Sequence, residues 1–412
     1  MNRISALGIL GVFFLFLTGC GKEEGEKLTI CISDLQEHSM KLLAEGWQEV
    51  EGGSEIEFVI IPTEPEEAEL KLSELRTEIM AGEGPDLFVM ECKSPTLEES
   101  HGGLFKNLKK SMETELFLPL DEYLEHAEYI NTDTWNTMVL EAGKTEEGQV
   151  VLPMYYHLPG YVFDSGDLSG EEIPDSWERL LASEDPVLKK AVRQKAFLYF
   201  GYSFGKLVDD QSGKLAFTEE ELSEYLKQLL AFEEDTDEKT DGQEIPEAIA
   251  DGWVNSEFLS AVNRAEKELT CIPVPDREGG AAAMVTMFAA INRNTGQAEG
   301  AFSFLDFMLS DEVTSGVGFQ KGDKRYGAGI ELDYYHDGIS VNQKVFEEKN
   351  CRNDKVKNIF ETFNGNISSV RFYSELDRDL YELYRMCFLS GDPDVDRLVT
   401  ETYQTMEMRL SE

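Results

Sequence analysis

The sequence has little positive charge. It holds 37 Lys and Arg against 81 Asp and Glu, which gives a formal net charge of −44 over 412 residues. Binding to nucleic acid requires clustered Lys and Arg to neutralise phosphates, so this balance argues against a nucleic-acid partner. It also argues against attachment to an anionic membrane through a basic face of the protein.

Residues that bind metals and phosphates are also scarce. The chain has six Cys and five His, without a C-x-x-C or H-E-x-x-H motif, so no zinc or redox site is predicted. The pair Gly82-Glu-Gly84 lies between a predicted helix and a predicted strand. A phosphate-binding glycine loop runs from a strand to a helix instead. We therefore expect no metal and no cofactor.

One apolar run, at the N-terminus, indicates where the protein resides. Residues 4–19 carry no charge and follow Asn2-Arg3. The run is shorter than the roughly 20 residues of a spanning helix and fits a secretory signal peptide. It ends in Leu17-Thr-Gly-Cys20, which resembles a bacterial lipobox. We expect removal of residues 1–19, lipidation of Cys20 and a polar tether over residues 20–26; the alternative is an uncleaved anchor.

The mature chain then has an odd number of other cysteines. These are Cys31, Cys92, Cys271, Cys351 and Cys387. An odd count in an exported protein leaves at least one free thiol. Free buried thiols are the preferred interpretation, and whether any of the five pair stays open.

Hydrophobic periodicity predicts an α/β protein. Short apolar runs at 28–32, 56–61 and 86–90 alternate with helical patterns at 40–50 and 68–79. This β-α-β-α-β order implies a parallel sheet with helices on its faces. The length makes two domains the default.

A second unit follows the first. Strands are predicted at 150–155, 160–163, 196–200 and 269–274, and helices begin near Asp175 or Ser176, at the Thr218 capping box, at Ala301, near Leu376 and near Val395. Trp47 and Trp177 repeat with their helices and are predicted core residues, whereas Trp135 in a predicted helix stays unassigned.

Several segments together resemble family 1 extracellular solute-binding proteins. This family supplies the substrate receptors of ABC importers and includes maltose-binding protein. The sharpest match contains Gly82-Glu-Gly-Pro-Asp86, and a second begins the helix at Pro174-Asp-Ser-Trp-Glu178. Weaker matches, in the family's order, are Leu118–Leu124, Gly148–Pro153, Ala301–Leu309 and Leu389–Gly391.

The resemblance implies the two-lobed, type II periplasmic-binding-protein-like fold, with mainly parallel sheets flanked by helices and a ligand cleft between the lobes. It places residues 27–154 and 276–330 in the N-terminal lobe and residues 155–275 and 331–412 in the C-terminal lobe. The chain should cross between lobes near Met154–Pro159, Ile272–Pro275 and Ala328–Val341.

The implied function is transport. A monomeric receptor on the outer face of the cytoplasmic membrane would bind a sugar or oligosaccharide. It would close about its hinge and deliver the ligand to ABC permease subunits without covalent chemistry. A receptor that presents its ligand to a sensor protein is a second possibility.

Five candidate ligand-binding residues follow from position. Tyr155, Tyr156 and His157 lie at the first implied crossing, where aromatic rings can stack on a sugar and their polar tips can bond hydroxyls. The alternative for these three residues is hinge packing. Asp34 and Glu91 follow the first and third predicted strands, where open α/β sheets bind ligands; the alternative is an exposed loop charge.

Two more candidates come from the resemblance. Trp253 and Tyr373 match segments from which relatives offer aromatic residues to the cleft; the alternative for both is the core. Many sugar-binding members also carry an aromatic residue after the first strand. This chain has Ser33-Asp-Leu-Gln36 there.

A serine hydrolase is the alternative from another class. Gly201-Tyr-Ser-Phe-Gly205 matches G-x-S-x-G and follows the predicted strand at 196–200. The nucleophile elbow also needs a helix directly after Ser203, whereas Lys206–Gly213 has the composition of a turn. The only downstream histidine is His336, so the loop interpretation is preferred.

Overall fold

The computed structural model describes residues 27–92, 103–170, 172–209, 212–234, 245–332, 338–390 and 393–411. The predicted signal peptide, the tether with Cys20, and His336 lie outside this part of the chain. Among the described residues, no helix has the length and apolar character needed to cross a membrane.

A seven-stranded sheet forms the centre of the molecule, in the order β13-β6-β10-β3-β1-β2, with β14 also paired to β10. The parallel pairing of β1 with β2 and β3 confirms the β-α-β-α-β prediction. However, β10 runs antiparallel to β3 and β6, so the complete sheet is mixed. The strands are β1 (Leu28–Ser33), β2 (Ile56–Ile61), β3 (Leu87–Glu91), β6 (Leu152–His157), β10 (Ala281–Ile291), β13 (Ile339–Ser340) and β14 (Ile367–Phe372).

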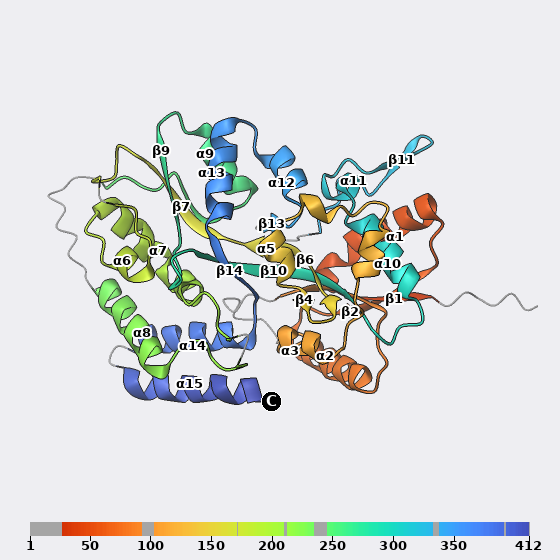
Figure 1. Ribbon diagram of the computed structural model, residues 1–412, viewed down its shortest axis with the longest axis horizontal. Helices are drawn as coiled ribbons and strands as arrows, with labels where there is room; N and C mark the ends of the chain where they lie inside the picture. The colour runs from red at the N-terminus through yellow and green to blue at the C-terminus, as the bar shows by residue number, and fades with distance from the viewer. Residues whose placement is uncertain are drawn as a thin grey trace, which may run out of the picture.

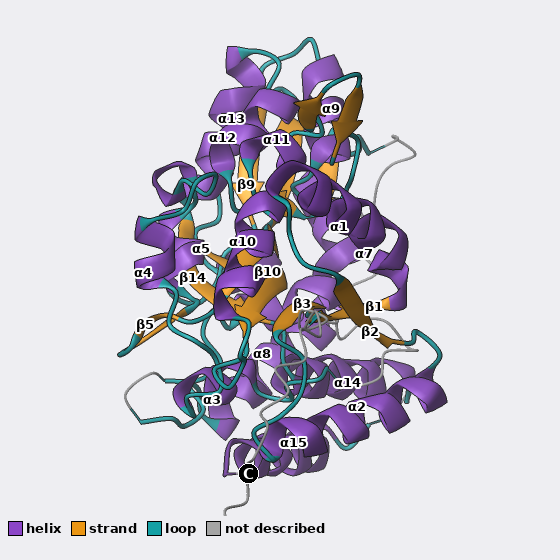
Figure 2. Cartoon of the chain, turned by 90° about the vertical axis from the view of Figure 1, so that its right-hand side faces the viewer, coloured by secondary structure: helices purple, strands orange, loops and turns teal. Residues whose placement is uncertain are grey.

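Helices cover both faces of this sheet (Figure 2). Leu28, Ile30 and Ile32 of β1 share a buried cluster with residues of α1 (Glu37–Glu51) and α10 (Ala298–Met308). The intervening Cys31 packs with α2 (Pro65–Met80) on the other face. Alternate residues of the strand therefore bury against different layers. Trp47 of α1 is 2% exposed, which confirms it as core.

The remaining elements build the other end of the molecule and the connections. A second sheet has the antiparallel order β8-β7-β9. Its strands are β7 (Pro159–Asp164), β8 (Ala250–Trp253) and β9 (Leu269–Pro273), and two hairpins are β4 (Lys144–Thr145) with β5 (Gly148–Gln149) and β11 (Phe319–Lys321) with β12 (Lys324–Tyr326). The other helices are α3 (Leu108–Glu113), α4 (Asp121–Glu125), α5 (Thr137–Glu141), α6 (Trp177–Leu181), α7 (Pro186–Ser203), α8 (Glu219–Glu234), α9 (Ser256–Arg264), α11 (Asp311–Thr314), α12 (Gln343–Asn350), α13 (Asp354–Gly365), α14 (Glu375–Leu389) and α15 (Val395–Ser411), with short 3₁₀ helices η1 (Asp34–Gln36) and η2 (Thr132–Thr134).

The elements form two lobes (Figure 1). We call the end with β1, β2, β3, α1, α2 and α10 the first lobe. The end with β7, β8, β9, α6, α7, α8, α14 and α15 is the second lobe. Strand β10 runs between them, so the two lobes share one continuous strand. This is the two-lobed α/β fold that the resemblance implies.

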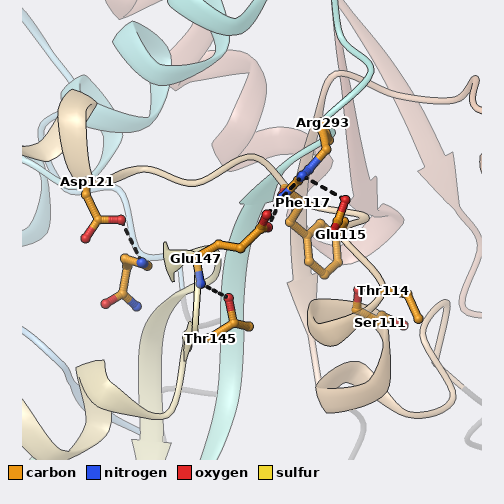
Figure 3. A network of polar contacts seen from close by, with 9 residues as sticks. Ser111, Thr114, Glu115, Phe117, Asp121, Thr145, Glu147 and Arg293 are labelled. Carbon is orange, nitrogen blue, oxygen red and sulfur yellow. Dashed lines mark hydrogen bonds and ion pairs between the residues drawn. The ribbon is translucent and has the colours of Figure 1, made fainter.

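Polar contacts hold the β4–β5 hairpin in place (Figure 3). Arg293, just beyond β10, contacts the carboxylates of Glu115 and Glu147 and donates from Nε to the carbonyl of Phe117 at 3.2 Å. Asp121 accepts the N–H of Gln149 at 2.8 Å. These contacts join β4, β5 and the segment before α4 to the end of β10.

One predicted strand is wrong. Residues 196–200 lie within the 18-residue helix α7. Pro186 occupies the first turn, and Asp185 caps the helix by accepting the N–H groups of Val187 and Leu188. A short apolar run cannot by itself distinguish a buried strand from a buried helix. The predicted helix at Trp135 is also wrong: Trp135 follows the 3₁₀ helix η2 and forms an isolated β-bridge with Asn342. Its side chain is buried.

Candidate functional site

The ends of two strands meet beside the middle of β10. Strand β14 pairs with β10 in parallel as far as Val285, and β3 pairs with it antiparallel from Met287 onward. Their C-terminal ends therefore converge next to Thr286, whose carbonyl accepts the N–H of Cys92 at 2.7 Å. Ligands of open α/β sheets bind outside the C-terminal ends of strands. The register of β10 thus identifies a candidate site with contributions from both lobes.

The opposite edge of β10 carries two predicted residues. The register with β6 shifts around Thr286, so that His157 lies opposite Met284 and Tyr155 lies opposite Met287. Directly opposed residues project to the same face of a sheet, and alternate residues share a face. Tyr155 and His157 therefore belong to one face, which continues from Met284 to Met287.

An aromatic cluster lies at the second-lobe end of this face, formed by His157, Tyr202, Trp253 and Tyr373. The rings of His157 and Trp253 are stacked, with centroids 4.8 Å apart and an interplanar angle of 8°. The centroid of Tyr202 is 5.2 Å from that of Trp253, and its hydroxyl is in hydrogen-bond contact with the hydroxyl of Tyr373. Trp253 and Tyr373 are half-buried. Three residues predicted from separate segments thus come together.

Burial sets the protonation state of the cluster's central phenol. It raises the pKa of Tyr202 well above the ordinary value, and the adjacent Tyr373 raises it further. Tyr202 is therefore a neutral group at physiological pH, able to donate or accept one hydrogen bond. It holds Tyr373 through that bond.

The first lobe places polar groups at the other end of the same face. Glu91 lies opposite Met287 across the β3–β10 pair, and Nε2 of Gln36 lies 3.7 Å from the sulfur of Met287. The backbone of Tyr373 hydrogen-bonds the thiol of Cys92, so the Glu91 end of β3 adjoins the aromatic cluster. The ends of β1, β3 and β14 therefore bring a carboxylate, an amide and the aromatic cluster close to one another.

Asp34 lies farther along the strand ends. Its Oδ2 accepts the N–H of Thr63 at 2.8 Å and the Thr63 hydroxyl at 2.9 Å. Its Oδ1 is buried and has no partner among the described residues. Asp34 therefore ties the ends of β1 and β2 together and keeps one oxygen able to accept a hydrogen bond.

Comparison with known proteins assigns the family. The family model described as "Bacterial extracellular solute-binding protein" matches residues 33–315, which is more than half of the chain. The chain belongs to this family. No curated protein sequence gives a match.

Solved structures agree on the fold of this solute-binding protein. A family 1 extracellular solute-binding protein from Alicyclobacillus acidocaldarius has a TM-score of 0.55 at 14% identity, covering 94% of this chain and 98% of that one. The sugar-binding protein MalE of Xanthomonas citri has a TM-score of 0.57 at 11% identity, covering 94% and 98%. A Thermotoga lettingae solute-binding protein bound with α-D-tagatose has 0.53 at 16% identity, covering 93% and 100%. At these identities the likeness shows the fold alone.

Tyr156 stands apart from the cluster. It is fully buried on the other face of β6, where its hydroxyl donates to Asn364 at 2.6 Å and accepts from Asn136 at 3.3 Å. Burial also raises the pKa of this phenol. Its neighbours Tyr155 and His157 face the site, as strand alternation requires.

Four residues of the site were not predicted from the sequence: Gln36, Tyr202, Met284 and Met287. Tyr202 belongs to the helix that was predicted to be a strand, and Met284 and Met287 lie in a strand that was not predicted. A helical interpretation of residues 186–203 would have placed Tyr199 and Tyr202 on one face. No sequence signal marks the two methionines, because their role depends on the register of β10.

The hydrolase motif does not form a nucleophile elbow in this solute-binding protein. Ser203 ends a helix instead of following a strand, and its side chain is completely buried. Its hydroxyl donates to the carbonyl of Phe200 at 2.8 Å. An elbow requires an exposed oxygen on a strained turn after a strand.

Neither metal nor disulfide chemistry is visible in the described part of the chain. No group of three or more His, Cys, Asp or Glu there could hold a metal ion. The five cysteines in that part are free thiols. A separate cavity of about 400 Å³ lies in the first lobe, with Glu122, Tyr129 and Phe302 in its wall, and none of the predicted site residues lines it.

Proposed function

We propose that this solute-binding protein is a lipid-anchored extracellular receptor that delivers a sugar or oligosaccharide to an ABC importer. The aromatic cluster beside the converging ends of β3 and β14 carries the proposal. Aromatic rings with polar tips recognise sugars because they offer an apolar face together with hydrogen-bonding groups.

The lobes would contribute different interactions to the ligand. In the second lobe, the half-exposed rings of Trp253 and Tyr373 would stack on the sugar, with His157 supporting Trp253 from behind. In the first lobe, the carboxylates of Glu91 and Asp34 would accept hydrogen bonds from sugar hydroxyls. Tyr155, between them on β6, would contact the middle of the ligand.

Structural neighbours support the sugar class. One is a cyclic α-maltosyl-1,6-maltose binding protein from Arthrobacter globiformis, and another was solved with α-D-tagatose. A third is an oligogalacturonide binding protein from Yersinia enterocolitica. The ligands differ in size and charge, so the fold supports the class of ligand and leaves its identity to experiment.

Delivery would follow from closure of the lobes. We propose that residues 27–154 and 276–330 move as one body against residues 155–275 and 331–412, with the crossings near Met154–Pro159 and Ile272–Pro275 among the segments that flex. Closure traps the ligand, and the closed form docks on the permease. No step requires a covalent intermediate or a cofactor. Lipidation at Cys20 would hold the monomeric receptor on the outer face of the cytoplasmic membrane.

A thermal-shift panel tests the binding function. Residues 27–412 are heated with maltose, D-tagatose, a maltooligosaccharide and an oligogalacturonide, and each mixture is analysed for turnover. A ligand at 100 times its dissociation constant stabilises the native state by about 2.7 kcal/mol, so one member of the panel should raise the melting temperature without being consumed. If the sugar that raises the melting temperature is also consumed, the proposed receptor function is wrong.

The anchor has its own test. Cys20→Ala should release or mislocalise the protein, because the thiol that carries the lipid is lost. Intact-mass analysis of the wild-type membrane form should show a lipidated chain that begins at residue 20. A membrane form that retains Met1 would contradict this part of the proposal.

A further inference from the structure

A buried ion pair lies directly behind the aromatic cluster. Arg371 is near the end of β14, and Asp377 is in the first turns of α14. Nη2 of Arg371 contacts Oδ1 of Asp377 at 2.6 Å, and the two side chains are 12% and 2% exposed. Charges this deeply buried are costly unless most of their other donors and acceptors are also satisfied. In this pair, Nε of Arg371 is buried without a partner among the described residues, whereas both of its Nη atoms and both Asp377 oxygens are bonded. Their other contacts therefore show what the pair holds.

The guanidinium of Arg371 fixes the end of α7. It donates from Nη2 to the carbonyl of Gly201 at 2.9 Å and from Nη1 to the carbonyl of Gly205. Carbonyls in the last turn of a helix lack partners within the helix, and a cation is favourable there. These two carbonyls bracket Tyr202 along the chain. Arg371 thus fixes the backbone that carries the central phenol of the cluster.

The carboxylate of Asp377 fixes the residue after Tyr373. Its Oδ2 accepts both the N–H and the hydroxyl of Ser374, each at 3.0 Å. Tyr373 therefore lies between two residues, Arg371 and Ser374, that are joined through one carboxylate. The backbone on both sides of its ring is held.

We propose that Arg371 and Asp377 are positioning residues for ligand recognition, an inference whose ligand arm rests on the proposed function. One ion pair sets the backbone of both Tyr202 and Tyr373, whose hydroxyls are in contact, and Tyr202 packs on Trp253. Neither residue needs to touch the ligand. Together they keep the stacking rings in one arrangement, so that the ligand does not have to order them on binding.

The same helix offers a matched control. Asp379, two residues beyond Asp377, pairs with Arg409 of α15 at 2.7 Å, and its side chain is 12% exposed. That pair joins α14 to α15. Asp379→Asn removes an Asp–Arg ion pair from the same helix, one whose arginine is 35% exposed, and leaves Arg371 and Asp377 in place.

The test compares Asp377→Asn and the milder Arg371→Lys with Asp379→Asn. Without ligand, the near-ultraviolet circular dichroism of each protein is measured with and without the further substitution Trp253→Phe. The difference between the two spectra is the Trp253 signal. We expect this Trp253 signal to change in both cluster variants and to stay at the wild-type value in Asp379→Asn. An unchanged signal in both cluster variants, with melting temperatures lowered as in the control, would overturn the proposal.

The ligand arm uses maltose as the probe in calorimetric titration. The two cluster variants should bind it roughly 3- to 10-fold more weakly than wild type, a loss comparable to that of one aromatic contact, and the control should bind it equally well. Equal affinity in all four proteins would overturn the positioning role. If wild type does not bind maltose, the proposed function fails for that sugar, and the Trp253 signal still decides the positioning role.

Discussion

At the scale of single residues, the two faces of β6 carry different tasks. Tyr155 and His157 face the candidate site, whereas Tyr156 between them hydrogen-bonds Asn364 in the core. Neighbouring aromatic residues should therefore respond differently to substitution. This difference separates binding from stability within one strand.

The first prediction compares Trp253→Ala with Tyr156→Phe. Loss of the Trp253 ring should weaken sugar binding by about 0.5–1.5 kcal/mol beyond the lost contact area. Tyr156→Phe removes a buried hydroxyl and its two partners' bonds, so it should lower the free energy of unfolding by about 1–3 kcal/mol and leave affinity unchanged. Calorimetric titration and urea denaturation give the two quantities. A variant pair with the opposite pattern would move the site to the other face of β6.

At this scale, His157 was predicted from its place after the predicted strand at 150–155, whereas Trp253 and Tyr373 were predicted from the family resemblance. The structure brings the three rings together. Tyr156 was named along with its neighbours, because the sequence does not show which face of β6 points to the site. Once the strand is seen, alternation assigns it to the core.

At the scale of elements, the residues that cap helix ends can be recognised in the sequence. The same residues contribute to the stability of the fold. The predicted capping box at Thr218 is present, with Glu221 accepting the N–H of Thr218 at 2.6 Å and donating its own N–H to the threonine hydroxyl at 3.2 Å. Ser176, one of two predicted caps, begins α6. Asp185 caps α7, and its side chain carries a charge, unlike those of Thr218 and Ser176.

The second prediction concerns Asp185→Ala and its pH dependence. Burial raises the pKa of Asp185, but N–H groups of Leu188, Ser169 and Val187 bonded to its carboxylate outweigh burial and bring the pKa below the ordinary 3.8. The charged cap therefore stabilises the fold above about pH 4, and this contribution is lost as pH falls through the folded-state pKa. At pH 7 the variant should lose about 0.5–2 kcal/mol of unfolding free energy.

Urea denaturation at pH 7 and pH 3 measures this difference. The gap between wild type and Asp185→Ala should shrink at pH 3. Asn353→Ala provides the control, because Asn353 caps α13 by accepting the N–H of Val356 at 3.0 Å without a titrating group. Its cost should be alike at both pH values. A pH-independent cost for Asp185→Ala would contradict the assignment.

The third prediction concerns Gly148, the first residue of β5 in the β4–β5 hairpin. Its φ is +114°, and a Cβ there would lie 1.9 Å from Oδ2 of Asp121. Gly148→Ala should therefore combine backbone strain with a steric clash that breaks the Asp121–Gln149 bond. Gly52→Ala is the matched control, since Gly52 has a φ of +73° and open space around it.

The control isolates strain alone, which costs about 1–2 kcal/mol for a left-handed residue. Gly148→Ala should lower the free energy of unfolding by more than that. Thermal unfolding of both variants decides the comparison. Equal losses would show that the Asp121 side chain moves aside without cost.

Elements with clear apolar patterns were predicted, whereas the strands β10 and β14 were not. Strands β1, β2 and β3 and helices α1 and α2 follow their hydrophobic patterns. Strand β10 is buried over nearly all of its eleven residues and is rich in alanine, which has a low preference for strands. It shows no alternation, because both of its faces are covered. Strand β14 begins among polar residues, Asn366-Ile-Ser-Ser369, and gave no signal either.

At the scale of the whole molecule, β10 explains why the candidate site could be predicted only in part. The sequence identifies both lobes and several residues near strand ends. It does not show that β3 and β14 meet end to end beside Thr286, because that arrangement depends on long-range pairing with β10. The same pairing joins the carboxylates of the first lobe to the aromatic cluster of the second.

The central claim is that a sugar binds between the lobes at this convergence, and hydrogen–deuterium exchange with and without the sugar from the thermal-shift panel tests it most directly. The account predicts new protection at Glu91–Cys92 in the first lobe together with Tyr155–His157, Trp253 and Tyr373. Protection confined to one lobe, or centred on the first-lobe cavity with Glu122, Tyr129 and Phe302 in its wall, would contradict the account.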